Sequence, residues 1–263
     1  MNRFNSKRVI VLVSCNLVLL LGAVFPLSGQ QLPPLNNPNL ASKQLDDMRL
    51  RGCGVAGLMA DLSLWYDIPI GFEVAMNTGD CARLRMDFKQ ATLVEVLNQF
   101  VAEHSEYEWE ISNGVVNVFP KEGRRDPILQ QILSAEIGIF SIKEGSVTWE
   151  VEKALLGTPQ VAAVMDSYGL KAPNWNFSGF YLPNVGPNFK IDVSNMSVRS
   201  VLNNIVKESK TAKFWSVSRD SIEHTLYLKL TANQENPQKL MRRADFEDLE
   251  ENLDLVSWDP ANR

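Results

Sequence analysis

Two segments of this chain, offset by 105 residues, carry the same pattern of apolar residues. Each begins with a short alternation of apolar and polar residues, which predicts a strand. Each continues with apolar residues at positions i, i+3, i+4, i+7 and i+8, which predicts a helix with one buried face. These helical positions are Leu93, Val96, Leu97, Phe100 and Val101 in the first segment, and Val198, Val201, Leu202, Ile205 and Val206 in the second. The repeat therefore predicts two similar α/β units.

Residues at the ends of these helices indicate where the helices begin and which elements come next. Thr92 and Ser197 precede the two apolar faces, and a hydroxyl at that position accepts a hydrogen bond from an unpaired backbone N–H. Glu95 lies three residues after Thr92 and completes a capping box. A hairpin is expected after each helix. Asn113-Gly114 is a strong turn signal for the first, and the second has a looser turn at residues 219–223.

A weaker strand–helix pattern precedes each segment. Apolar residues from Val55 to Leu62 have helical spacing, and residues 68–74 are typical of a strand. In the second half, residues 137–142 predict a strand, Ser146 is expected to cap the next helix, and Gly157-Thr158-Pro159 is expected to end it. Each unit should thus contain two strand–helix–strand elements.

The best-defined of these segments, Leu84–Phe119, resembles the short N-terminal domain of secretins and TonB-dependent receptors. It has that family's strand, amphipathic helix, aromatic strand and final strand after a glycine turn. Lys190–Leu230 resembles a second, more diverged copy. The resemblance implies an α+β fold of two tandem βαβ–βαβ modules, with helices packed on small sheets, that works as a periplasmic interaction domain. No outer-membrane barrel, plug or secretin core follows in this sequence, so the receptor and secretion roles are not carried over.

The N-terminal residues have the composition of an export signal. Arg3, Lys7 and Arg8 precede the apolar run Val9–Phe25, and small residues before Gln30 offer a cleavage site. We therefore expect an exported protein of the periplasm or cell envelope. The alternative is an uncleaved inner-membrane anchor through Val9–Phe25, the only case in which a membrane contact is expected. The expected organisation is a signal peptide (1–29), a linker (30–43), module 1 (44–122), module 2 (128–232) and an acidic, mobile tail (233–263).

The charge of the chain restricts its partners. Removal of Met1–Gly29 takes away three basic residues and no acidic one, which changes the formal net charge from -5 to -8. An acidic protein repels phosphate backbones and anionic membrane surfaces. Nucleic acid is therefore not expected as a partner, and another envelope protein is.

Two cysteines remain once Cys15 leaves with the signal. An even number in an oxidising compartment predicts a disulfide between Cys53 and Cys81. The alternative is two buried thiols with no bond between them. With only two histidines in the chain and no CxxC motif, no zinc site or other metal site is expected.

One motif imitates a cofactor site. Gly52-Cys53-Gly54-Val55-Ala56-Gly57 has the GxGxxG spacing of dinucleotide-binding proteins, and Glu73 follows about twenty residues later, where such proteins hold a ribose hydroxyl. The preceding residues are too polar for a buried parallel strand. We instead expect glycines that allow a tight turn into a helix, and no cofactor. Since the sequence has no GxSxG, HExxH or SxxK motif, no enzymatic activity is expected.

The strongest candidate for a binding surface is the segment 172–188, which is rich in Asn, Gly and Pro. Its aromatic residues either bind a partner or cover the core of module 2. They are Trp175, Phe177, Phe180 and Tyr181. We predict a protein–protein interaction or scaffold module that acts through these residues or through sheet edges. The alternative class is an envelope enzyme with carboxylate-based chemistry, which no residue constellation supports.

Overall fold

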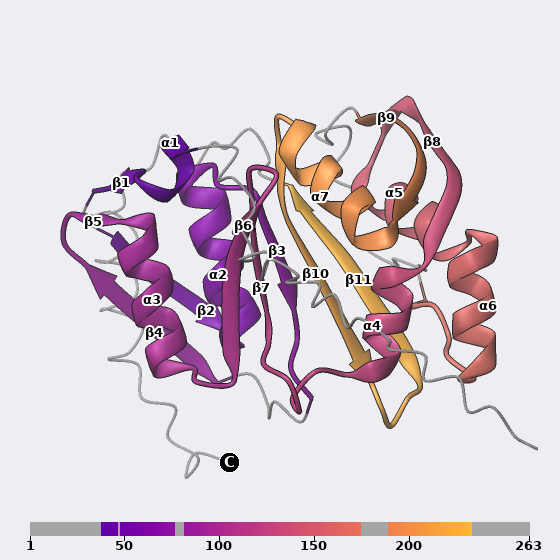
Figure 1. Ribbon diagram of the computed structural model, residues 1–263, viewed down its shortest axis with the longest axis horizontal. Helices are drawn as coiled ribbons and strands as arrows, with labels where there is room; N and C mark the ends of the chain where they lie inside the picture. The colour runs from indigo at the N-terminus through magenta and orange to yellow at the C-terminus, as the bar shows by residue number, and fades with distance from the viewer. Residues whose placement is uncertain (1–37, 47, 77–81, 175–188, 233–263) are drawn as a thin grey trace, which may run out of the picture. The chain divides into compact units, whose positions relative to one another are not determined.

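A five-stranded sheet joins the two halves of the chain in the computed structural model (Figure 1). The structure describes residues 38–46, 48–76, 82–174 and 189–232, which all lie in one compact unit. The strand order is β11–β10–β3–β7–β6. These strands are β3 (Ile70–Glu73), β6 (Tyr107–Ser112), β7 (Val115–Pro120), β10 (Ala212–Asp220) and β11 (Thr225–Ala232). The parallel pairing of β3 with β10 connects strands from both halves.

Helices cover both faces of this sheet (Figure 1). Helices from the first half, α2 (Gly54–Tyr66) and α3 (Leu93–Glu103), pack on one face. Helices from the second half, α4 (Pro127–Ser134), α5 (Thr148–Leu156) and α7 (Val198–Glu208), pack on the other. A further helix, α6 (Pro159–Ser167), packs beside α4 and α5. The expected α+β class is confirmed.

Three antiparallel strand pairs flank the central sheet. They are β1 (Gln44–Leu45) with β5 (Ala91–Thr92), β2 (Met48–Cys53) with β4 (Arg83–Phe88), and β8 (Glu136–Ser146) with β9 (Phe189–Ser197). A short helix, α1 (Pro38–Ala41), lies within the segment expected to be a linker, and its Leu40 is buried in the core of the first half.

The alternation of side chains along the strands separates two hydrophobic cores. Ile70, Phe72, Val116 and Val118 point toward α2 and α3, whereas their neighbours in sequence point toward the helices of the second half. Each core also takes side chains from the other half. Phe214 of β10 lies in the first core, and Val115 of β7 lies in the second. The two halves therefore share a sheet and have separate cores on its two faces.

Close backbone approach at the junction depends on one glycine. The register places Trp215 of β10 directly beside Gly71 of β3. A Cβ on Gly71 would lie 2.4 Å from the Trp215 ring, so only glycine leaves room for the indole. Trp215 is 1% exposed and is one of the largest fully buried side chains. The sheet is thus continuous because a large ring in one half lies against a missing side chain in the other.

The local elements of the repeat form as expected. Thr92 accepts from the N–H of Glu95 and the Glu95 carboxylate accepts from the N–H of Thr92, which confirms the capping box. Ser197 caps α7 through the N–H of Ser200. The turn residues Asn113 and Gly114 have φ of 54° and 80°, as a tight two-residue hairpin requires.

Three details of the second half differ from expectation. Ser146 does not cap a helix, because β8 continues through it and pairs it with Phe189. Helix α5 begins one residue later, where the Glu150 carboxylate accepts the N–H of Val147. Residues 123–127 were expected only to link the halves, but Asp126 caps α4 through the N–H of Ile128. Pro159, expected to end a helix, begins α6.

Replacing Gly71 with alanine tests the packing of Trp215 on β3. Gly71→Ala should lower the free energy of unfolding by about 1–3 kcal/mol, because the new methyl group overlaps the indole. The matched control is Gly138→Ala in β8, where a Cβ meets nothing within 4 Å. Urea denaturation would measure both, and equal stability of the two variants would contradict the close approach.

Candidate functional site

The aromatic residues expected to form a binding surface lie outside the part of the chain that the structure describes. They are Trp175, Phe177, Phe180 and Tyr181, and Cys81 lies outside it too. Their roles stay predictions.

Cys53, the other cysteine of the predicted disulfide, is exposed at the end of β2. The register pairs it with Arg83 of β4, and the N–H of Gly54 donates to the carbonyl of Ala82 at 2.8 Å. Because Cys81 directly precedes Ala82 in the chain, this strand pairing is compatible with the disulfide, which stays a prediction.

The glycines of the GxGxxG motif serve chain packing. A Cβ on Gly52 would lie 2.3 Å from the backbone of Gly57, so β2 and the first turn of α2 approach closely here. Gly54 has a φ of 67°, which lets the chain turn from the strand into the helix. Strand β2 pairs antiparallel with β4 in a separate two-stranded sheet. A dinucleotide-binding motif needs a parallel sheet at this point.

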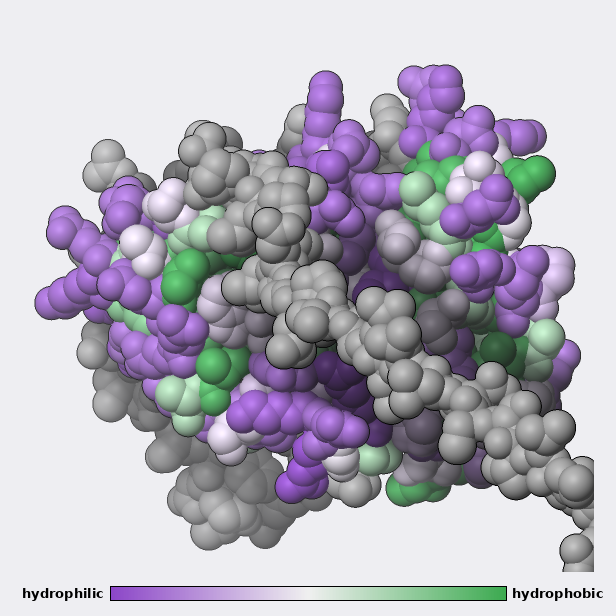
Figure 2. All heavy atoms as spheres, in the orientation of Figure 1, coloured by the Kyte–Doolittle hydropathy of each residue, from purple (hydrophilic) through white to green (hydrophobic). Residues whose placement is uncertain are grey.

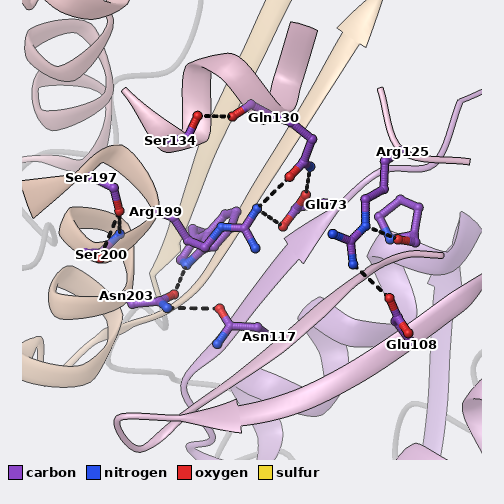
Figure 3. Close-up of polar contacts among 12 residues, drawn as sticks. Glu73, Glu108, Asn117, Arg125, Gln130, Ser134, Ser197, Arg199, Ser200 and Asn203 are labelled. Atoms are coloured by element: carbon purple, nitrogen blue, oxygen red, sulfur yellow. Dashed lines mark hydrogen bonds and ion pairs between the residues drawn. The ribbon is translucent and has the colours of Figure 1, made fainter. Parts of the chain in front are cut away.

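The structure brings together a set of polar side chains that the sequence did not single out as a group (Figure 3). We call it the polar junction, because its members come from both halves and meet on the face of the sheet below α4 and α7. It consists of Glu73 on β3, Asn117 on β7, Gln130 on α4, Arg199 and Asn203 on α7, and Trp215 on β10.

An ion pair forms the charged part of the polar junction. Arg199 Nη2 lies 2.7 Å from Glu73 Oε1, and the two side chains are 27% and 4% exposed. Gln130 donates to Glu73 Oε2 at 2.5 Å and accepts from Arg199 at 3.3 Å. Burial raises the pKa of the Glu73 carboxyl above its usual value, and the Arg199 guanidinium and the Gln130 hydrogen bond oppose this shift.

Amide groups form the uncharged part. Trp215 donates its indole N–H to Asn203 Oδ1 at 2.8 Å, and Asn203 donates to Asn117 Oδ1 at 2.9 Å. This chain of hydrogen bonds starts at the indole that lies on Gly71 and ends on a strand of the first half. It therefore fixes α7 relative to β7 and β10.

A second buried ion pair lies where the chain passes between the halves. Arg219 of β10 donates to Asp126 Oδ2 at 2.7 Å, and the two side chains are 18% and 5% exposed. The other oxygen of Asp126 caps α4. One carboxylate thus connects the start of α4 to the central sheet.

The geometry of the polar junction favours a role in holding the halves together. A general base must direct a lone pair at its substrate. Both oxygens of Glu73 are instead occupied, one by Arg199 and one by Gln130. The local signal for this cluster was small: Arg199 and Asn203 lie four residues apart and hence on one side of α7.

A third buried carboxylate lies away from the polar junction, on α5. Glu152 accepts the N–H of Leu230 from the outer edge of β11 at 2.5 Å. Burial raises the pKa of the Glu152 carboxyl to about 7, and the bond from Leu230 and the nearby Lys229 act in the opposite direction.

Two properties of the described ranges bear on the class of site. They contain no group of three or more His, Cys, Asp or Glu side chains placed to hold a metal ion. They also contain no helix that is long and apolar enough to cross a membrane. The apolar run Val9–Phe25 lies outside these ranges.

Comparison of the chain with protein-family models, with curated proteins and with solved structures found no match.

Removing one member of the buried ion pair should cost more than removing both. Arg199→Met leaves the Glu73 carboxylate buried without its cation, and should lower the free energy of unfolding by about 2–4 kcal/mol at neutral pH. Adding Glu73→Gln should recover part of this loss, as a double-mutant cycle would show. Additive effects would contradict the pairing. The exposed Arg124→Met serves as the control.

Glu152 should make stability depend on pH. Its pKa of about 7 in the folded state exceeds the ordinary glutamate value of 4.5, so the folded protein binds a proton that the unfolded chain releases. Stability from this group is complete at low pH and is lost as pH rises from 4.5 to about 7, by about 3 kcal/mol in total. Glu152→Gln should remove this loss in urea denaturation, whereas the exposed Glu144→Gln should not. Parallel pH profiles for wild type and Glu152→Gln would exclude the effect.

Proposed function

We propose that this chain is an exported envelope protein that acts as a scaffold by binding a strand of a partner protein at the edge of β6. In this proposal it consists of two tandem modules, residues 44–122 and 128–232, after a signal segment, of the kind that accompanies secretins or TonB-dependent receptors. The observation that carries the proposal is the parallel pairing of β10 with β3, because β10 is the counterpart of β6 in the repeat.

The correspondence between the two hairpins supports this step. Strand–helix–hairpin units run β4–β5–α3–β6–β7 in the first half and β9–α7–β10–β11 in the second. A register shift between Ala212 and Phe214 adds one residue to β10, so Trp109 of β6 corresponds to Trp215. In the second half, this strand binds β3 along its outer side. In the first half, the same side of β6 ends the sheet.

The backbone groups on the outer side of β6 follow from the hairpin. A two-residue turn makes Ser112 and Val115 a hydrogen-bonded pair, and such pairs alternate along an antiparallel ladder. Glu110 therefore bonds with Asn117 across the ladder. The N–H and C=O groups of Trp109 and Ile111 point away from β7, where they can pair with a further strand.

The opposite end of the sheet is closed. The N–H of Leu226 on β11 donates to the carbonyl of Lys171 at 2.9 Å, and the N–H of Lys171 donates to His224 at 2.8 Å. The N–H of Leu230 is bound by Glu152. Covering an edge in this way prevents unwanted pairing. The two edges of the sheet are therefore unequal, and β6 is the one suited to a partner.

The surface agrees with binding through a strand edge. On the face seen in Figure 2, hydrophilic side chains predominate among the described residues and hydrophobic ones form small, separate patches. A large exposed apolar patch would indicate a different kind of interface. The partner strand should carry a small residue opposite Trp109, as Gly71 does opposite Trp215.

The test is crosslinking in intact cells that make the protein. A photo-crosslinking amino acid at Glu110, exposed on β6, should capture a protein in the envelope fraction, in a product whose mature N-terminus is near Gln30. Ile111→Pro removes one outward N–H and no ladder bond, and should abolish capture. Ile111→Thr keeps that N–H and should retain it.

Two results would overturn the proposal. One is equal capture by the proline and threonine variants, which would place the contact away from the strand edge. The other is recovery of the product from the cytoplasm with Met1 intact. Thermal unfolding of both variants checks that the fold is retained.

A further inference from the structure

The outer face of the β2–β4 pair carries a cluster of arginines. Side chains alternate along both strands, so Leu50 and Met86 are buried while their neighbours point outward. The outward positions hold four exposed arginines, which we call the arginine face: Arg49, Arg51, Arg83 and Arg85.

The pairing of the strands concentrates this charge. Arg51 lies directly opposite Arg85 in the register, and like charges in that position destabilise a strand pair. Asp87 lies opposite Arg49 and binds Arg85 at 2.7 Å, with side chains 55% and 46% exposed for Arg85 and Asp87. The outward positions of the pair thus hold four guanidinium groups and one carboxylate.

This cluster is unusual for the chain in which it occurs. The formal net charge is -5, and the described ranges contain eight arginines, so half of them lie on this one strand pair. Guanidinium groups bind carboxylates with two parallel hydrogen bonds. The arginine face therefore matches an acidic peptide segment.

A segment with the required charge lies at the other end of the same chain. Residues 244–255 contain six carboxylates and no basic residue. They follow β11, whose last residue is Ala232, after eleven intervening residues. Eleven extended residues reach about 36 Å, close to the diameter of roughly 40 Å expected for a folded unit of this size. The tail is thus long enough to reach a distant face.

We propose that the arginine face binds the acidic segment 244–255 of the C-terminal tail of the same molecule. Individual exposed ion pairs are weak, but a short tether holds the segment at an effective concentration of about 1 mM. Several weak pairs then suffice to keep it bound at low salt. This contact is separate from the β6 edge, and neither depends on the other.

Proteolysis of the full chain tests the contact. Trypsin cleaves after Arg243, next to the acidic segment, and cleavage should follow the unbound population. The variant replaces all four arginines of the face with glutamine. A control variant removes the same charge from exposed positions elsewhere: Lys121→Gln, Arg124→Gln, Lys143→Gln and Lys190→Gln. A synthetic peptide of residues 238–255 in the same tube corrects for the activity of trypsin.

At about 20 mM salt, cleavage after Arg243 should be about fivefold slower in wild type and in the control than in the arginine-face variant. The difference should vanish at about 0.5 M salt, where charges are screened beyond about 4 Å. Equal cleavage of wild type and variant, or a control as fast as the variant, would overturn the proposal. Protection that grows with protein concentration would also overturn it, because the tail would then bind a second copy.

Discussion

The contact between Trp215 and Gly71 is the interaction on which the arrangement of the two halves depends. An indole needs more room than two adjacent parallel strands usually leave, and Gly71 provides it by having no side chain. With β3 and β10 paired, five strands form one sheet with two covered faces. Phe214 and Trp215, neighbours on β10, then point into different cores. One strand thereby contributes to the stability of both halves.

The polar junction makes this arrangement specific. Buried ion pairs contribute little net stability, since the desolvation of two charges offsets their attraction. A misplaced helix α7 would, however, leave Glu73 and Asn117 buried without their partners, which is costly. The same reasoning applies to Asp126 and Arg219. Polar contacts therefore exclude alternative dockings of the halves, while the apolar cores provide most of the burial.

The repeat is assembled head to tail. The strand that ends the first copy is β6, and its counterpart β10 binds the opposite side of that first copy through β3. An association between unlike surfaces always leaves one surface of each kind unused at the ends. The chain closes one of these ends with Lys171 and Glu152 and leaves β6 at the other. This asymmetry is the physical basis for assigning the partner to β6.

The sequence by itself determined the local elements with strong, short-range signals. The apolar faces of α3 and α7, the capping box at Thr92 and the turn at Asn113-Gly114 all involve residues within eight positions of one another. It did not indicate α4, whose cap Asp126 lies in a segment rich in turn residues, nor the continuation of β8 through Ser146.

Only the tertiary structure decided which strands of the two halves pair, and hence which polar residues meet. Glu73 and Arg199 are far apart in the sequence, and each has an ordinary local context: the end of a strand and the first turn of a helix. Their contact depends on the register of β3 against β10, which is set by the fit of Trp215 on Gly71. No local pattern encodes that register, because the packing that selects it exists only once both halves have folded.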